Sequence, residues 1–214
     1  MAIAMTDESS DYQSGNGYGG GIQRGSQRCG GDTLIEVLVA LVIIMVGILS
    51  LVGLQTRIQQ SEVEAYQRAQ ALILLQDMVA RINANQSAAG CYAITTSGGS
   101  PFYGTGVSGS SFSCTGYGDP TSQARAVADM QDWNSMLQGE SEKHGGAAIG
   151  AMTGGRGCVT LTDSTNQIYL VAVAWQGLSD LASPSVDCGN NLYGTEERRR
   201  VVWMTFRLGN LAAS

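Results

Sequence analysis

Residues 31–56 read GDTLIEVLVALVIIMVGILSLVGLQT. From Val37 to Thr56 this stretch carries no charged side chain, and a helix of that length rises far enough to cross about 30 Å of hydrocarbon. Glu36 stands at the start of the apolar run. Because a carboxylate carried to the centre of a bilayer costs about 2.5–3.5 kcal/mol or more, Glu36 is a candidate functional residue.

A glycine, a short polar bridge, a glutamate and an apolar span together resemble the N-terminus of type IV prepilins, usually written G-F-T-L-I-E. The resemblance implies that prepilin peptidase cuts after Gly31 and that Asp32 becomes a methylated N-terminus. It also implies that Glu36 neutralises the N-terminal amine of a neighbouring subunit during filament assembly. Such a charge pair costs less in lipid than two isolated charges. Asp32 departs from the family pattern, in which Phe or Met usually follows the cut.

A signal anchor or a cleavable secretory signal is the competing interpretation of this segment. A secretory signal has a shorter apolar core and is cut on the far side of that core, whereas here the plausible cut precedes a longer span. We therefore predict that residues 1–31 form a cytoplasmic leader and that residues 32–55 form a transmembrane and assembly helix. Arg24 and Arg28 supply the positive charge expected on the cytoplasmic side.

The helix is expected to continue beyond the membrane. Neither Gly nor Pro occurs from Gln55 to Ala89, and the residues there are mostly good helix formers. Residues 56–89 are therefore predicted to form an amphipathic helix of the ectodomain, continuous with the span from about Thr33 to Ala88. Its expected apolar stripe comprises Tyr66, Ala69, Leu72, Leu75, Val79 and Ile82.

Residues 90–214 are predicted to form a β-rich globular head. A short helix is expected to open at Asp119-Pro120-Thr121, with a buried face of Ala126, Met130, Trp133 and Leu137. Strands are expected at residues 157–163, 167–175 and 199–208, which are rich in β-branched and aromatic side chains. The connections favour an antiparallel sheet packed against the stripe of the long helix. The predicted class is thus α+β and pilin-like.

Four of the five cysteines lie beyond the span, on the side that would be periplasmic: Cys91, Cys114, Cys158 and Cys188. Four cysteines in an exported domain indicate two disulfides, for which three connectivities exist. Moderate loop lengths favour Cys91–Cys114 with Cys158–Cys188. A metal site is the alternative, but the sequence has no CxxC spacing and no paired histidine. Cys29 would be removed with the leader.

The composition argues against several other functions. A net charge of −6 is unfavourable for nucleic-acid binding. The basic cluster Arg198-Arg199-Arg200 adjoins two glutamates and is read as a solvated entrance to a strand. His144, the sole histidine, is accompanied by no nucleophile elbow. We therefore expect no catalytic residue, no cofactor and no metal.

Within the pilin-like families, the chain resembles the PilV minor pilins, known as type IV pilus modification proteins. The segments that carry the resemblance are LIEVLVAL (34–41), Gly53-Leu54-Gln55, Arg81-Ile82-Asn83, Asp132-Trp133, Tyr169–Trp175, and Cys188 followed by Arg199-Arg200-Val201-Val202. The resemblance implies a low-abundance subunit that helps to initiate pilus assembly in a tip or priming complex.

The implied partners are prepilin peptidase, the inner-membrane assembly platform, other minor pilins, the major pilin and a tip adhesin. The implied location is the bacterial inner membrane, with the head in the periplasm, and then the pilus at the cell surface, where adhesion and twitching motility would follow. A minor pseudopilin of a type II secretion system is the alternative. A membrane-anchored periplasmic binding or enzymatic domain is a third possibility.

Overall fold

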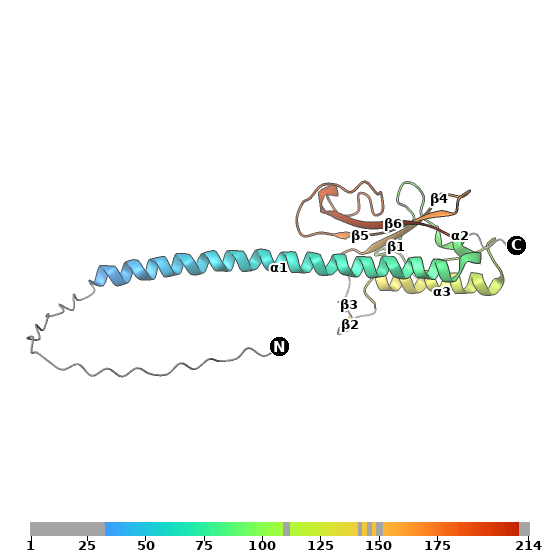
Figure 1. Cartoon of the computed structure of the whole chain (residues 1–214). Coiled ribbons are helices and arrows are strands. Elements are labelled where there is room, and N and C mark those ends of the chain that lie inside the picture. The colour runs from blue at the N-terminus through green and yellow to red at the C-terminus, as the bar shows by residue number, and fades with distance from the viewer. Residues whose placement is uncertain (1–32, 109–111, 141–142, 145–146, 149–151, 210–214) are drawn as a thin grey trace, which may run out of the picture. The chain divides into compact units, whose positions relative to one another are not determined.

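The computed structural model describes residues 33–108, 112–140, 143–144, 147–148 and 152–209. The chain divides into two units, residues 1–49 and 50–214, and each unit is described by itself. The described part of the first unit consists of Thr33 and the beginning of helix α1, which spans Leu34–Ala84 (Figure 1). The long helix expected from about Thr33 is therefore confirmed.

In the second unit, α1 buries one face against the head. The buried residues of α1 are Gln67, Ala71, Leu75, Met78 and Ile82. The predicted stripe is correct at Leu75 and Ile82, which are buried, and at Val79, which is half-buried against the core. It is wrong at Tyr66, Ala69 and Leu72, which are exposed. Three residues of an α-helix turn by about 300°, which is about 60° short of a full turn. Each step of three therefore places the next side chain about 60° around the helix from the previous one. A stripe built from such steps therefore drifts around the helix, whereas the observed one uses mainly steps of four.

The long helix ends slightly earlier than predicted. Asn85 leaves the helical conformation, with φ −130° and ψ 53°, and a 3₁₀ turn at Gln86–Ala88 (η1) and a short helix α2 at Ala89–Tyr92 follow. The Asn85 side-chain amide donates to the backbone oxygen of Ser122 at 2.8 Å. This bond links the end of α1 to the first turn of the next long helix.

Helix α3 (Pro120–Leu137) begins where the sequence predicted. Asp119 is its N-cap, and one carboxylate oxygen accepts from the backbone N–H groups of Thr121 and Ser122 at 2.8 and 3.1 Å. Pro120 occupies the first helical position, where its missing N–H costs nothing. The predicted buried face is confirmed, since Ala126, Met130, Trp133 and Leu137 are all fully buried.

The cap predicts a pH dependence of folding stability. Hydrogen bonds from Ser122, by its hydroxyl and its backbone N–H, and from Thr121 lower the pKa of Asp119 to about 2. Because the unfolded chain has the ordinary higher pKa, it takes up the proton first on acidification. The stabilising contribution is therefore complete above about pH 4 and is lost towards pH 2. Urea titrations should show Asp119→Ala less stable than wild type at pH 7, with a smaller difference at pH 2.5. A difference that stays constant with pH would contradict this account.

A four-stranded antiparallel sheet forms the second layer of the head, in the order β1-β4-β5-β6. Strands β4 (Arg156–Asp163), β5 (Ile168–Gln176) and β6 (Arg199–Arg207) lie where the sequence predicted. The two-residue strand β1 (Tyr103–Gly104) was not expected, because it lies in a Gly/Ser-rich segment. A second, two-stranded sheet pairs β2 (Lys143–His144) with β3 (Ala147–Ala148).

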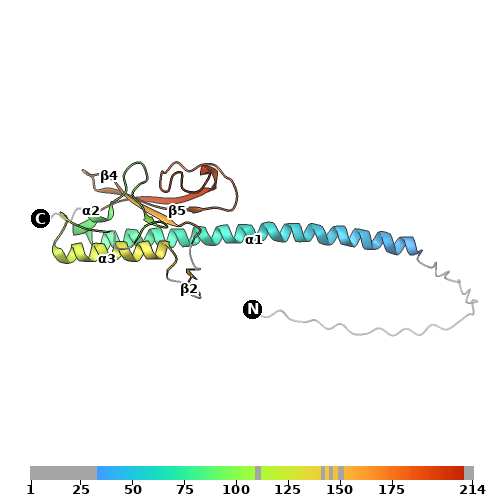
Figure 2. The ribbon, with the colours of Figure 1, turned by 180° about the vertical axis from the view of Figure 1, so that it is seen from behind.

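The second half of α1 and α3 lie side by side on one face of this sheet (Figures 1 and 2). Alternate residues of β5 divide between the two faces of the sheet. Tyr169, Val171, Val173 and Trp175 join the main core, and Ala172 and Ala174 join a smaller cluster with Cys158 and Cys188. The α+β, pilin-like architecture of a long helix against an antiparallel sheet is thus confirmed.

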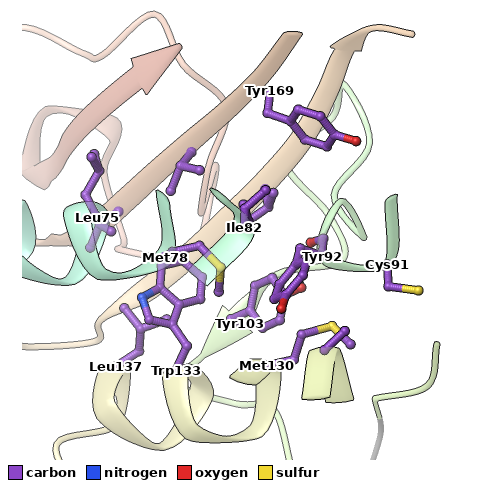
Figure 3. Packing of buried hydrophobic residues seen from close by; sticks show 14 of the residues in the cluster. Leu75, Met78, Ile82, Cys91, Tyr92, Tyr103, Met130, Trp133, Leu137 and Tyr169 are labelled. Carbon is purple, nitrogen blue, oxygen red and sulfur yellow. The ribbon is translucent and has the colours of Figure 1, made fainter. Parts of the chain in front are cut away.

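Trp133 lies at the centre of the core (Figure 3). Its ring makes an edge contact with Tyr103, with centroids 5.0 Å apart, and its indole N–H donates to the Leu74 backbone oxygen at 2.9 Å. One side chain of α3 thereby contacts both α1 and β1. Trp133 is a core residue, as the sequence indicated.

Candidate functional site: an exposed apolar helix and a braced head

The described residues of the first unit form an apolar surface. Every residue from Thr33 to Leu49 is exposed, and the side chain of Leu34 is 78% accessible. In a soluble protein such a continuous apolar surface marks a contact with lipid or with another chain. In the part of the chain that the structure describes, α1 is the one helix long and apolar enough to cross a membrane.

Glu36 lies in the first turn of α1. Its backbone N–H donates to the Thr33 oxygen at 2.8 Å, and the helix N-terminus favours a negative side chain there. Among the described residues, no basic side chain forms an ion pair with the Glu36 carboxylate. Gly31 and Asp32, the predicted cleavage pair and methylated terminus, lie outside the described residues.

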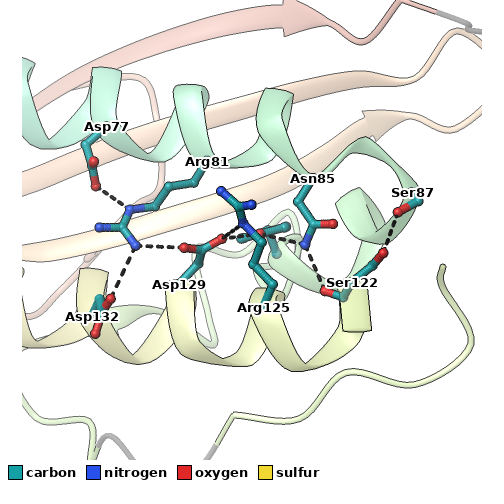
Figure 4. Close-up of polar contacts among 9 residues, drawn as sticks. Asp77, Arg81, Asn85, Ser87, Ser122, Arg125, Asp129 and Asp132 are labelled. Carbon is teal, nitrogen blue, oxygen red and sulfur yellow. Dashed lines mark hydrogen bonds and ion pairs between the residues drawn. The ribbon is translucent and has the colours of Figure 1, made fainter. Parts of the chain in front are cut away.

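In the head, a polar cluster joins α1 to α3 (Figure 4). The Arg81 guanidinium donates to Asp77 at 2.7 Å and to Asp129 at 2.9 Å, and lies 3.6 Å from Asp132. The other oxygen of Asp129 accepts from the Tyr92 hydroxyl at 2.6 Å. The sequence had singled out Arg81 and Asp132 only as parts of a resemblance and had not identified Asp129, which faces Arg81 only after α1 and α3 pack together.

This cluster is structural in character. Burial raises the pKa of Tyr92, and its hydrogen bond to Asp129 adds to the shift. The tyrosine hydroxyl therefore remains protonated at physiological pH and acts as a hydrogen-bond donor. An arginine held by carboxylates of two helices, with a tyrosine behind it, fixes the helices relative to each other.

Two disulfides are present in the head. Cys91 pairs with Cys114, with Cα atoms 5.2 Å apart, and Cys158 pairs with Cys188, with Cα atoms 5.7 Å apart. These are the pairings that loop length favoured. The first ties α2 to the segment before α3, and the second ties the outer face of β4 to the loop between β5 and β6. Among the described residues, no group of three or more His, Cys, Asp or Glu side chains could hold a metal ion.

Removing the second disulfide is expected to destabilise the head substantially. The double substitution Cys158→Ala with Cys188→Ala should lower the free energy of unfolding by about 2–4 kcal/mol, because the unfolded chain regains the freedom of a closed loop. Urea titration of the full chain in detergent would measure the change. An identical stability for the oxidised wild type and the double variant would show that the bond does not brace the head.

Arg199 corrects the sequence-based reading of the basic cluster. Its side chain is only 2% exposed, not solvated. The guanidinium pairs with Glu196 at 2.6 Å and donates to the backbone oxygens of Val186, Cys188 and Pro184. A buried arginine thus holds the loop that carries Cys188. Arg199 lies between Arg198 and Arg200, whose side chains are partly exposed. The sequence therefore gave no sign that Arg199 alone is buried and holds this loop.

Glu64 holds the other end of the same loop. One of its carboxylate oxygens accepts from the backbone N–H groups of Leu178 and Ser179 at 3.1 and 3.3 Å, and from the Ser179 hydroxyl at 3.1 Å. Arg200 lies 3.7 Å from the same oxygen. The loop between β5 and β6 is therefore attached to α1 through the Glu64 carboxylate.

The head has an α+β fold of pilin-like architecture, and its long helix α1 begins with a segment long and apolar enough to cross a membrane. Comparison with family models finds a match to the prokaryotic N-terminal methylation motif over residues 27–52 and to type IV pilin Tt1218 over residues 53–131. The chain is thus similar to a type IV pilin over part of its length and carries a segment similar to the N-terminal methylation motif. Type IV pilins are structural subunits, not enzymes. Comparisons with curated proteins and with solved structures find no match.

The first match includes Gly31, Asp32 and Glu36, and the second ends within α3. A methylation motif implies processing by prepilin peptidase and assembly with other pilins, and it is consistent with membrane anchoring followed by display on a pilus.

Proposed function

We propose that this chain is a minor pilin of a type IV pilus, of the PilV kind, which helps to initiate pilus assembly within a tip or priming complex. Prepilin peptidase removes residues 1–31, and the amine of Asp32 is methylated. Residues 32–55 insert in the inner membrane and later in the filament. Residues 56–89 continue this helix into the periplasmic head, formed by residues 90–214.

The observation that carries the proposal is the exposed apolar beginning of helix α1, with the Glu36 carboxylate in its first turn and no ion pair from Glu36 to another described residue. A helix that is apolar all round needs lipid or other helices around it. Once the Glu36 carboxylate is buried among apolar helices, it needs a cation close to it. The amine of a neighbouring processed subunit meets that need, since processing places it four residues before Glu36.

The remaining partners follow from this role. The inner-membrane assembly platform would extract the subunit from the bilayer, and other minor pilins and the major pilin would surround its helix. A tip adhesin would bind the exposed head, which links the subunit to adhesion and twitching motility. The disulfides and the Arg81 and Arg199 clusters support this role, because a head at a pilus tip has to stay folded outside the cell.

Processing at Gly31 is the direct test of the proposal. Mass spectrometry of the protein from its native host should give a chain that begins at methylated Asp32. Deletion of the prepilin peptidase should leave residues 1–31 attached, and Gly31→Leu should block cleavage in the presence of the enzyme. The neighbouring substitution Gly30→Leu, which leaves the cleaved bond unchanged, serves as the control. An intact leader in peptidase-positive cells would refute the proposal.

A further inference from the structure

Strand β6 is an edge strand of the four-stranded sheet, since among the described residues it pairs with β5 alone (Figure 1). The Arg198 oxygen accepts from Gly177 N–H at 2.8 Å, and Leu208 N–H donates to the Gln167 oxygen at 3.1 Å. In an antiparallel pair, residues two apart share the same bonding direction. The even-numbered residues of β6 therefore bond to β5, and Val201, Trp203 and Thr205 turn their N–H and C=O groups away from the sheet.

This edge lacks the usual protection against pairing with another chain. Edge strands of soluble proteins commonly carry a charge, a proline or a bulge in their centre. Val201–Phe206 reads VVWMTF and has none of these. Trp203 is 53% exposed and Met204 is 42% exposed. Among the described residues, no hydrogen bond reaches the backbone of Val201, Trp203 or Thr205, so an apolar edge with unpaired backbone groups faces outward.

The charges of β6 argue against a second copy of this chain as the occupant. Its charged residues are Arg199, Arg200 and Arg207, all basic. If two copies paired their β6 strands antiparallel about Trp203, Arg207 of one copy would lie opposite Arg199 of the other. If they paired parallel and in register, the two Arg207 side chains would lie beside each other. Like charges opposite each other destabilise a strand pair. Arg199 and Arg200 have carboxylate partners in this chain. Arg207 forms no ion pair with another described residue; its guanidinium donates to the Asn166 backbone oxygen, and, in addition to hydrogen bonds from Asn166, its charge helps to lower the pKa of the exposed Asp163 carboxyl group.

We propose that the outer edge of β6 accepts an extended strand from the head of a different pilin subunit, with an apolar centre and a carboxylate placed against Arg207. The incoming strand gains backbone hydrogen bonds to Val201, Trp203 and Thr205, and its apolar side chains cover Trp203 and Met204. This interaction would join heads directly, in addition to the contacts of the N-terminal helices. The identity of the partner as a pilin rests on the proposed function.

Thr205 permits a test that spares the fold. Its N–H points away from β5, so Thr205→Pro removes an outward donor without removing a bond of the sheet, and proline is tolerated at such edge positions. Thr205→Val keeps the donor and serves as the matched control. In native membranes, Thr205→Pro should reduce recovery of the complex with other pilins about tenfold, and Thr205→Val should leave it unchanged. Unchanged recovery with Thr205→Pro would overturn the inference.

A photo-cross-linking residue at position 205 supplies evidence that does not depend on proline being tolerated. It should cross-link to an extended, carboxylate-flanked segment of another pilin, mapped by mass spectrometry, and a cross-linker at exposed Ala128 on α3 should not. Arg207→Glu should weaken the complex, and a basic residue at the mapped carboxylate should restore it. The inference would be overturned if position 205 cross-linked to a second copy of this chain or within the same chain. It would also be overturned if the cross-linking yield at position 205 did not exceed the yield at Ala128.

These outcomes separate the inference from the proposed function. If processing at Gly31 and dependence on Glu36 hold while position 205 makes no contact with another pilin, the edge proposal fails and the pilin role stands. If Gly31 is not processed, the pilin role fails whatever position 205 contacts.

Discussion

Replacing Glu36 with glutamine is expected to leave membrane insertion and cleavage after Gly31 intact and to reduce incorporation into pili by a factor of roughly 100. The amide removes the negative charge but keeps the size and hydrogen-bonding capacity of the side chain. The amine of the neighbouring subunit then stays buried without a counter-charge. Breaking a buried ion pair in this way costs about 3–5 kcal/mol, and about 2.7 kcal/mol already corresponds to a hundredfold change in an equilibrium.

Glu62→Gln is the matched control for this experiment, because Glu62 is an exposed glutamate on the same helix. Quantitative immunoblotting of sheared pili and of membranes would measure the two pools. The variant Glu36→Asp keeps the charge and should retain part of the incorporation. Equal amounts of wild type and Glu36→Gln in sheared pili would rule out the charge pair, whereas loss of both pools would indicate a failure of insertion.

Replacing Trp133 with alanine should destabilise the head by about 3–5 kcal/mol, the range for truncation of a buried aromatic side chain. The indole is fully buried between α1, β1 and β4 and supplies a hydrogen bond to Leu74. A Cβ atom added at Gly157 would approach the Trp133 ring to 2.1 Å, which shows how closely the ring is enclosed. Alanine therefore leaves a cavity that the surrounding elements cannot close without moving.

Trp203→Ala provides the comparison, since the same chemical change is made where the ring is 53% exposed. Its effect on the stability of the isolated subunit should be below about 1 kcal/mol. Chemical denaturation of both variants in detergent, followed by tyrosine and tryptophan fluorescence, measures the difference. Similar losses for the two variants would show that the burial of Trp133 is not what stabilises the core.

The sequence predicted the elements well where a local pattern was sufficient. The Asp119-Pro120 start of α3 and its spacing of buried residues are set by capping and helical period, both of which act within a few residues. The strands β4, β5 and β6 follow from runs of β-branched and aromatic residues. The sequence did not reveal β1, because Tyr103-Gly104 forms a strand only through pairing with Arg156 and Gly157.

The side chains of the head needed the tertiary structure. The predicted stripe of α1 included Tyr66 and Leu72, which remain exposed, because apolar residues occur on more than one side of the helix. Burial of Arg199 depends on carbonyl groups of the β5–β6 loop that are 11–15 residues away in the chain. The pairing of Arg81 with Asp129 spans 48 residues and exists only after α3 packs on α1.

The sequence by itself determined that this chain has a membrane-length apolar helix with Glu36 at its start, preceded by a glycine, and followed by an amphipathic helix and a strand-rich head. These features are local, since they depend on a run of uncharged residues, on the spacing of apolar side chains and on a motif of a few residues. The tertiary structure decided which side of α1 is buried, which polar groups join α1 to α3, and which backbone groups of β6 face outward. Those properties depend on contacts between residues far apart in the chain, so no local pattern contains them.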